Sequence, residues 1–185
     1  MPNYVMNRLQ LDGENDAVRV VREFIRGDGG CQIDFNKIVP VPPHIYTGNL
    51  GEEHRKLFGT DTWYDWCPKY WGTKWNAICN NDAEKCTDDT IFFQTAWCGV
   101  IKLIYLLACR FPNIIFTYEF ADEDFGNNCG KYVIKEGFAG VCVTPRNGSR
   151  DAFEIAQSLW HIETYYWDDV KSCICSRPDD FGDEG

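Results

Sequence analysis

The sequence lacks the residue patterns that the commonest metal and phosphate sites require. It has only three histidines, and none of its ten cysteines stands in the Cys-x-x-Cys pair that zinc and iron–sulfur sites usually contain. The closest spacing is Cys173-x-Cys175, and we reject a site completed by His161. No glycine-rich loop with a Lys-Ser/Thr partner is present. We therefore expect no metal centre and no cofactor.

A hydrophobic run long enough to cross a membrane is also missing. The longest run, residues 100–109, is interrupted by Lys102 and is too short to span a bilayer. The first residues, Met1-Pro2-Asn3-Tyr4, do not form the basic and then apolar start of a secretory signal. We therefore expect a cytoplasmic protein whose cysteines act mainly as reduced, small apolar residues, although the sequence leaves open whether any of them pair.

Positive charge is scarce in this chain. Eighteen basic residues face 28 acidic ones, for a net charge of -10. Duplex nucleic acid and anionic membranes would repel such a protein, whereas a basic partner protein would be attracted. Two acidic stretches stand out, Asp122-Glu123-Asp124 and the tail at residues 176–185. We interpret the first as a solvated turn rather than a cation site, and the second as a frayed terminus.

Catalytic motifs are absent as well. Nucleophilic catalysis needs an activated thiol or hydroxyl within reach of a base. Cys67, between Trp66 and Pro68, and Cys98, at a helix entry, are the thiols that merit a test. None of the histidines, His44, His54 and His161, lies in a recognisable catalytic motif. The sequence favours a protein that is not an enzyme, and an enzyme of unrecognised type, tested at Cys67, His161 and Asp65, stays as an alternative.

Hydrophobic periodicity predicts an α+β fold. Alternating residues indicate strands, and apolar residues at spacings of three and four indicate helices. The predicted elements are a strand at 3–11, a helix after Asn15 or Asp16 that Gly27 ends, paired strands at 73–79 and 90–97, a helix at 100–111, and a strand at 114–120. This β-α-β-β-α-β order is the ferredoxin-like (split βαβ) arrangement, an antiparallel sheet with two helices on one face.

We predict a single domain over residues 1–185, with additions to that core. The core covers 2–30 and 73–122, and a structured insertion at 31–72 separates its halves. In the insertion we expect an extended piece at 33–39 and a short helix at 52–58. A hairpin and a helix at 129–166 follow the core, the hairpin from 131–135 and 138–144 and the helix from Arg150 to Tyr165. The acidic tail at 176–185 ends the chain.

An aromatic cluster at residues 63–76 is the most distinctive segment. It contains four of the seven tryptophans and two tyrosines. Trp75 begins the predicted strand and is expected in the core, whereas the rings before it are expected in irregular chain. Two readings stay open: the cluster anchors the insertion to the sheet, or it also forms a binding groove. The candidate groove residues are Trp63, Tyr64, Trp66, Lys69, Tyr70, Trp71 and Lys74.

Several blocks of the sequence stand out together: Pro2-Asn3-Tyr4, Asn7-Arg8-Leu9, residues 35–42, residues 63–67, residues 71–77 and Thr95-Ala96-Trp97. In their order and residue types they resemble the YubB-like family with a ferredoxin-like domain, which bacteriophages and plasmids encode. With the later strands, the resemblance covers about residues 2 to 143. The chain departs from the family at Cys98-Gly99-Val100, where a proline-rich continuation is expected. The resemblance implies a fold and a mobile-element setting, and it brings no reaction and no catalytic residues.

These observations together favour an acidic, non-catalytic binding protein of a phage or plasmid. We expect it to dock on a host or phage protein, such as a host-defence or regulatory factor. The main alternative is a binder of single-stranded nucleic acid or nucleotides, which would stack bases on exposed aromatic rings. The net charge argues against that alternative, because such stacking surfaces normally accompany a basic groove.

Overall fold

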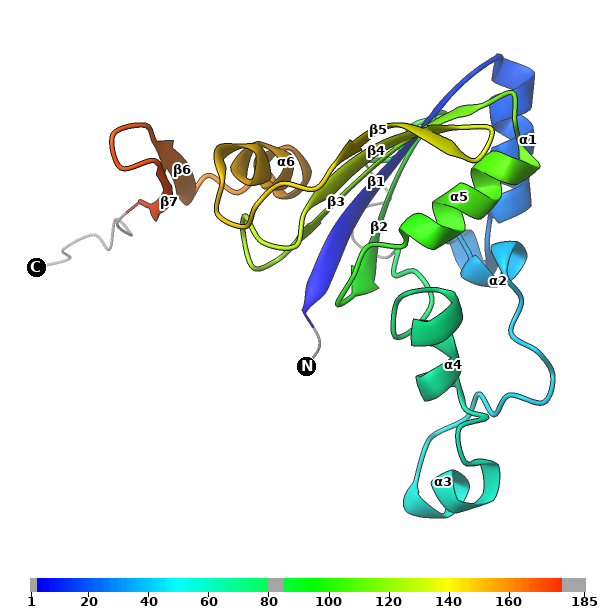
Figure 1. Cartoon of the computed structure of the whole chain (residues 1–185). Coiled ribbons are helices and arrows are strands. Elements are labelled where there is room, and N and C mark those ends of the chain that lie inside the picture. Colours follow the sequence, from blue (N-terminus) through cyan, green and yellow to red (C-terminus); the bar gives the residue numbers. More distant parts are fainter. Residues whose placement is uncertain (1–2, 80–84, 178–185) are drawn as a thin grey trace, which may run out of the picture.

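The computed structural model describes residues 3–79 and 85–177, and its centre is an antiparallel five-stranded sheet (Figure 1). The strand order is β2-β1-β3-β4-β5, and each neighbouring pair is antiparallel. The strands are β1 (Tyr4–Asp12), β2 (Thr90–Ala96), β3 (Ile115–Asp122), β4 (Gly130–Lys135) and β5 (Phe138–Val143).

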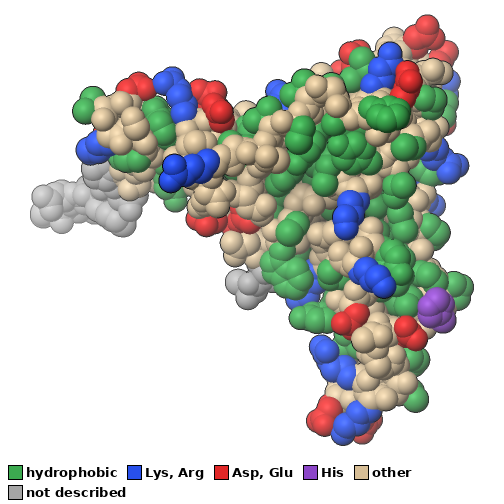
Figure 2. Space-filling view, in the orientation of Figure 1, with side chains coloured by type: hydrophobic (Ala, Val, Ile, Leu, Met, Phe, Trp, Pro, Cys, Tyr) green, Lys and Arg blue, Asp and Glu red, His purple; other side chains and the backbone are tan. Residues whose placement is uncertain are grey.

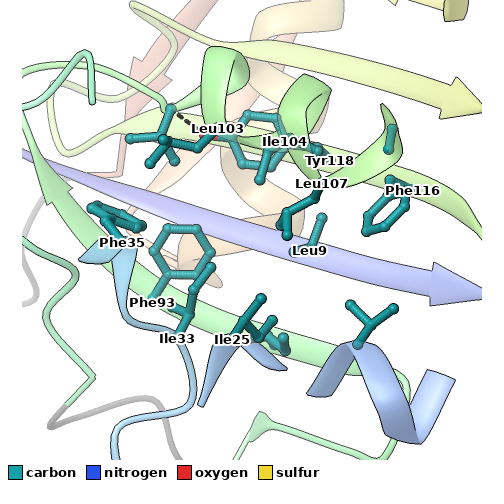
Figure 3. Close-up of a cluster of buried hydrophobic side chains, with 14 of the residues drawn as sticks. Leu9, Ile25, Ile33, Phe35, Phe93, Leu103, Ile104, Leu107, Phe116 and Tyr118 are labelled. Atoms are coloured by element: carbon teal, nitrogen blue, oxygen red, sulfur yellow. Dashed lines mark hydrogen bonds between the residues drawn. The ribbon is translucent and has the colours of Figure 1, made fainter. Parts of the chain in front are cut away.

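Two helices cover one face of this sheet, α1 (Asn15–Ile25) and α5 (Ile101–Arg110). Their apolar stripes meet the inward residues of β1, β2 and β3 in one buried cluster (Figure 3). Leu9, Phe93 and Tyr118 represent the three strands in this cluster, and all three are fully buried. The predicted ferredoxin-like order of β1, α1, β2, α5 and β3 is confirmed, and β4 and β5 extend the sheet as the predicted hairpin.

The outer strand expected at 73–79 is reduced to a single bridge. Ile78 and Gln94 exchange two backbone hydrogen bonds of 2.9 and 2.8 Å, and the rest of the segment is bent. At the start of this segment, the Thr73 side chain takes the place of a pairing strand. Its hydroxyl donates to the carbonyl of Ala96 and accepts a hydrogen bond from the N–H of the same residue. Without a regular strand, the alternation that placed Trp75 in the core does not hold, and this side chain is half-exposed.

The insertion contains more helix than its sequence suggests. It holds α2 (Phe35–Ile38), α3 (Glu52–Phe58) and α4 (Trp63–Tyr70), after a 3-10 turn, η1 (Asp28–Gly30). The helix at 52–58 agrees with the prediction. The extended piece predicted at 33–39 is wrong, because the Asp34 side chain accepts from the N–H of Asn36 and caps a short helix. The irregular chain predicted before Trp71 is also wrong. Trp63, Trp66 and Tyr70 recur at helical spacing, and they belong to α4, which includes Pro68.

The opposite face of the sheet carries α6 (Arg150–Trp160), which packs on a second buried cluster with Met6, Phe92 and Ala121 (Figure 1). The prediction that this helix continues to Tyr165 is wrong. His161 adopts a left-handed conformation (φ 53°) that ends the helix. A small hairpin that was not predicted follows, formed by β6 (Tyr165–Asp168) and β7 (Cys173–Ser176). Most of the predicted acidic tail lies outside the described residues.

A disulfide joins Cys31 to Cys79, which corrects the expectation of reduced thiols for this pair. These residues lie 48 positions apart and flank the insertion, so the bond ties its two ends together beside the buried Ile33. The sequence could not identify the pair, because proximity of the two segments arises only when the insertion folds back on the sheet. None of the helices in the described part of the chain has the length and hydropathy needed to cross a membrane.

Candidate functional site

The aromatic cluster divides into a buried half and an exposed half. Trp66 and Trp71 are 8 % and 3 % exposed, and their rings meet edge to face at 5.4 Å. The indole N–H of Trp71 donates to the carbonyl of Val39 at 2.8 Å, and its ring packs against Phe35. Trp71 is therefore core that fastens the insertion to the sheet, and it is not available as part of a groove. Trp66 exposes only a small part of its surface to solvent.

A groove of about 620 Å³ lies between the proline-containing segment at 39–45 and helix α4. Its apolar part comes from Val39, Pro40, Pro42, Ile45, Trp66 and Tyr70, and its polar part from His44, Thr60, Asp61, Asp65 and Lys69. Three of the seven predicted groove residues therefore line it, namely Trp66, Lys69 and Tyr70. Tyr70 is 44 % exposed and stacks on Trp66 with the ring centroids 4.7 Å apart, which presents a flat aromatic wall.

The charged side chains that line the groove differ in how firmly their neighbours hold them in place. The ammonium of Lys69 lies 5.2 Å from the centroid of the Tyr70 ring, in cation–π contact. Asp65 accepts a hydrogen bond of 2.8 Å from the Thr62 hydroxyl, which fixes its carboxylate at the start of α4. Asp61 and Asp65 are exposed. A groove with apolar walls and two exposed carboxylates suits an apolar group next to a cation.

A second surface forms around Lys74, another of the predicted residues. Its ammonium lies 4.8 Å from the ring centroid of Trp75, 5.1 Å from that of Trp97 and 5.6 Å from that of Tyr64. The guanidinium of Arg55 approaches the same Tyr64 ring at 5.0 Å. Lys74 forms no salt bridge with the described residues, and its ammonium contacts the faces of these three aromatic rings instead.

Sequence reasoning missed Trp97 and Arg55 as members of this surface. Trp97 follows β2 with a φ of 73°, which turns its ring out of the sheet to 40 % exposure. Its N–H donates to the carbonyl of Asn3, and its carbonyl accepts from the Asn128 side chain, so the backbone is held on both sides. The Thr95-Ala96-Trp97 block was the only signal in the sequence. Trp63, by contrast, donates its indole N–H to the carbonyl of Gly48 and braces the insertion.

The thiols singled out for catalysis are not activated. Burial raises the pKa of the Cys67 thiol to about 11, so the thiol stays protonated near neutral pH. The pKa of Cys98 is also raised, first by burial and then by the nearby charge of Asp122. His54 stacks on Tyr46 and accepts the N–H of Gly51 on its Nδ1. Neither thiol has the lowered pKa that a nucleophile needs.

In the acidic turn at residues 122–124, the carboxylate of Asp122 has a structural role. Asp122 is 5 % exposed and accepts from the side chains of Asn3 and Asn128 and from the N–H of Asp124. Across the residues that the structure describes, no three His, Cys, Asp or Glu side chains are grouped so that they could hold a metal ion.

The fold agrees with a comparison against families of known proteins. Residues 71–163, half of the chain, match the family described as the ferredoxin-like domain in Api92-like protein. The chain belongs to this family. The matched part begins at Trp71 and includes β2 to β5, α5 and α6, together with Lys74, Trp75 and Trp97. Helix α4 and the groove before it lie outside the match. No curated protein and no solved structure matches the chain.

Proposed function

We propose that this chain is a non-catalytic binding protein of a phage or plasmid that docks on a host or phage protein through the groove beside α4. The observation that carries the proposal is the groove itself, where Trp66 and Tyr70 form an aromatic wall beside the carboxylates of Asp61 and Asp65. A host-defence or regulatory factor is the kind of partner that a mobile element would target, and the mobile-element setting rests on the resemblance to the YubB-like family.

The chemistry of the groove specifies the partner's side chains. An apolar side chain would contact the prolines and Trp66, and an adjacent lysine or arginine would meet Asp61 or Asp65. The net charge of -10 acts in the same direction at longer range, because it attracts basic proteins and accelerates their association at low salt. The partner surface is therefore expected to be basic and to carry at least one exposed apolar residue.

The experiment compares capture by the wild type with capture by groove variants. Immobilised protein is exposed to host lysate at low salt, a retained protein is identified, and its affinity is then measured with purified components. The double change Asp61→Asn and Asp65→Asn should weaken that affinity by about tenfold or more. Glu53→Gln, on exposed α3 outside the groove, serves as the control and should leave the affinity unchanged. Equal affinity of the double variant and the wild type would refute docking in this groove.

A binder of single-stranded nucleic acid is the second candidate, because Lys74 and Arg55 lie among partly exposed rings. Such rings stack bases while nearby cations meet phosphates. The test is a titration with single-stranded oligonucleotides in which tryptophan emission is followed. Lys74→Ala should abolish the change in emission, and Lys102→Ala, at an exposed position on α5, should preserve it. Emission that stays constant with the wild-type protein would remove this candidate.

A further inference from the structure

The hairpin of β6 and β7 carries two cysteines whose sulfur atoms are in contact. Cys173 and Cys175 are two positions apart in β7, so their side chains point to the same face of the hairpin. The two Sγ atoms lie 3.7 Å apart, close enough for one thiol to donate a hydrogen bond to the other. Both cysteines are free, and both are partly exposed. The structure therefore presents a reduced pair of thiols at its surface.

The two faces of this hairpin have different surroundings. Ile174, between the two cysteines, points to the other face and packs with Tyr165 against the second buried cluster. Tyr165 also stacks on Phe125, with the ring centroids 4.6 Å apart. Figure 2 shows the hairpin projecting from the rest of the molecule, with acidic and basic side chains on its surface. One face thus attaches the hairpin to the protein, and a small reagent can reach the sulfur atoms on the other.

The two thiols do not ionise independently of each other. The hydrogen bond with Cys175 raises the pKa of the Cys173 thiol, the carboxylate of Asp168 raises it further, and the ammonium of Lys171 lowers it. Two negative sulfur atoms in contact would repel each other, so the pair loses its second proton less easily than its first. One thiolate beside one thiol is the combination that attacks a disulfide and then resolves the product.

A disulfide between these cysteines competes with the regular geometry of β7. Residues two positions apart in a strand have Cα atoms about 6.7 Å apart, near the upper end of the range that disulfides accept. The Cα atoms of the Cys31–Cys79 disulfide are 5.5 Å apart. Bonding of Cys173 to Cys175 would therefore shorten β7 around Ile174 and disturb its pairing with β6. Such a strained, exposed disulfide is readily reduced again.

We propose that Cys173 and Cys175 are a reversible oxidation site, which exchanges with a small disulfide such as oxidised glutathione and loosens the β6–β7 hairpin. One thiolate attacks the small disulfide, and the first small thiol leaves. The second cysteine then attacks the protein sulfur of the mixed disulfide, and the second small thiol leaves. One S–S bond breaks and one forms. The protein gives up two electrons and two protons, which the two released thiols carry away.

The site lies apart from the groove beside α4 and from the surface around Lys74. Its success or failure is therefore independent of the proposed function.

The test equilibrates the full chain with glutathione buffers of increasing oxidised fraction, then alkylates it and measures peptide masses. The peptide with Cys173 and Cys175 should lose two hydrogen atoms and resist alkylation, and dithiothreitol should reverse both changes. Cys173→Ser and Cys175→Ser should instead each retain one glutathione. Cys142, an exposed free cysteine on β5, is the internal control and should also retain glutathione. A pair that stays alkylatable when Cys142 carries glutathione overturns the proposal, as does a pair that accumulates glutathione like the single variants.

Hydrogen exchange tests the effect on the hairpin. After oxidation, the backbone N–H groups of residues 165–176 should exchange about tenfold faster or more, and those of β1 and β3 should keep their rates. The double variant Cys173→Ser/Cys175→Ser, treated with the same buffer, should show no change. Equal exchange of the hairpin in the reduced and oxidised wild type would overturn the loosening of β6 and β7.

Discussion

Removing the hydroxyl of Tyr118 tests the polar network at the centre of the core. Tyr118 is fully buried between the sheet and α5 (Figure 3). Its hydroxyl donates to Asn7 Oδ1 at 2.6 Å and accepts from the N–H of Val100 at 2.7 Å. Asn7 in turn donates to the hydroxyl of Thr95 at 3.0 Å. One hydroxyl thus joins β1 and β3 to the start of α5.

The change Tyr118→Phe keeps the ring and removes both hydrogen bonds. The Asn7 carbonyl and the Val100 N–H then stay buried without this partner, and each such group costs about 1 to 3 kcal/mol. We therefore expect the free energy of unfolding to fall by about 2 to 6 kcal/mol. With a urea m value near 2 kcal/mol/M, the unfolding midpoint should fall by about 1 to 3 M. Urea titration followed by tryptophan fluorescence measures this shift.

The matched control is Tyr105→Phe, which removes a hydroxyl from α5. Tyr105 is half-exposed, and its hydroxyl has no hydrogen bond to the residues described, so the midpoint should change little. A loss below about 1 kcal/mol in Tyr118→Phe would show that its two partners are satisfied in another way, and would refute the network as drawn.

Three further outcomes follow from buried groups. Burial raises the pKa of Tyr118 and of Cys67 in the folded state, so above about pH 9 the unfolded chain loses these protons first. The free energy of unfolding, measured by urea titration, should therefore fall as the pH rises above this value. A free energy that stays constant up to about pH 11 would contradict this expectation. The double variant Cys31→Ala/Cys79→Ala removes the disulfide that closes a loop of 48 residues, so its free energy of unfolding should be lower by up to about 4 kcal/mol. Equal melting temperatures of this variant and the wild type would contradict the expectation. Glu119→Gln removes the buried carboxylate that pairs with Arg8 and Lys131. Calorimetry should show a free energy of unfolding lower by about 1 to 3 kcal/mol, and an unchanged melting temperature would contradict the pairing.

The predicted groove residues show where sequence reasoning stops. The cluster at 63–76 stands out in the sequence, but its residues separate in three dimensions. Trp71 becomes core, Tyr70 faces the groove, and Lys74 lies on another surface with Trp97. The sequence shows that aromatic residues are concentrated in this segment. The exposure of each ring depends on the structural element that carries it and on what packs against that element. The spacing of Trp63, Trp66 and Tyr70 is the helical pattern that could have separated them.

The sequence by itself determined the fold class and the order of the core elements. Alternation in β1, β2 and β3 and the apolar stripes of α1 and α5 are local patterns, and each depends only on the burial of one face. Tertiary structure alone decided the contacts between distant segments. The Cys31–Cys79 disulfide, the reduction of the strand at 73–79 to one bridge and the placement of Trp97 beside Lys74 all depend on residues that meet only after the chain has folded. Local periodicity carries no information about such meetings, because it records the environment of a side chain and not the identity of its neighbour.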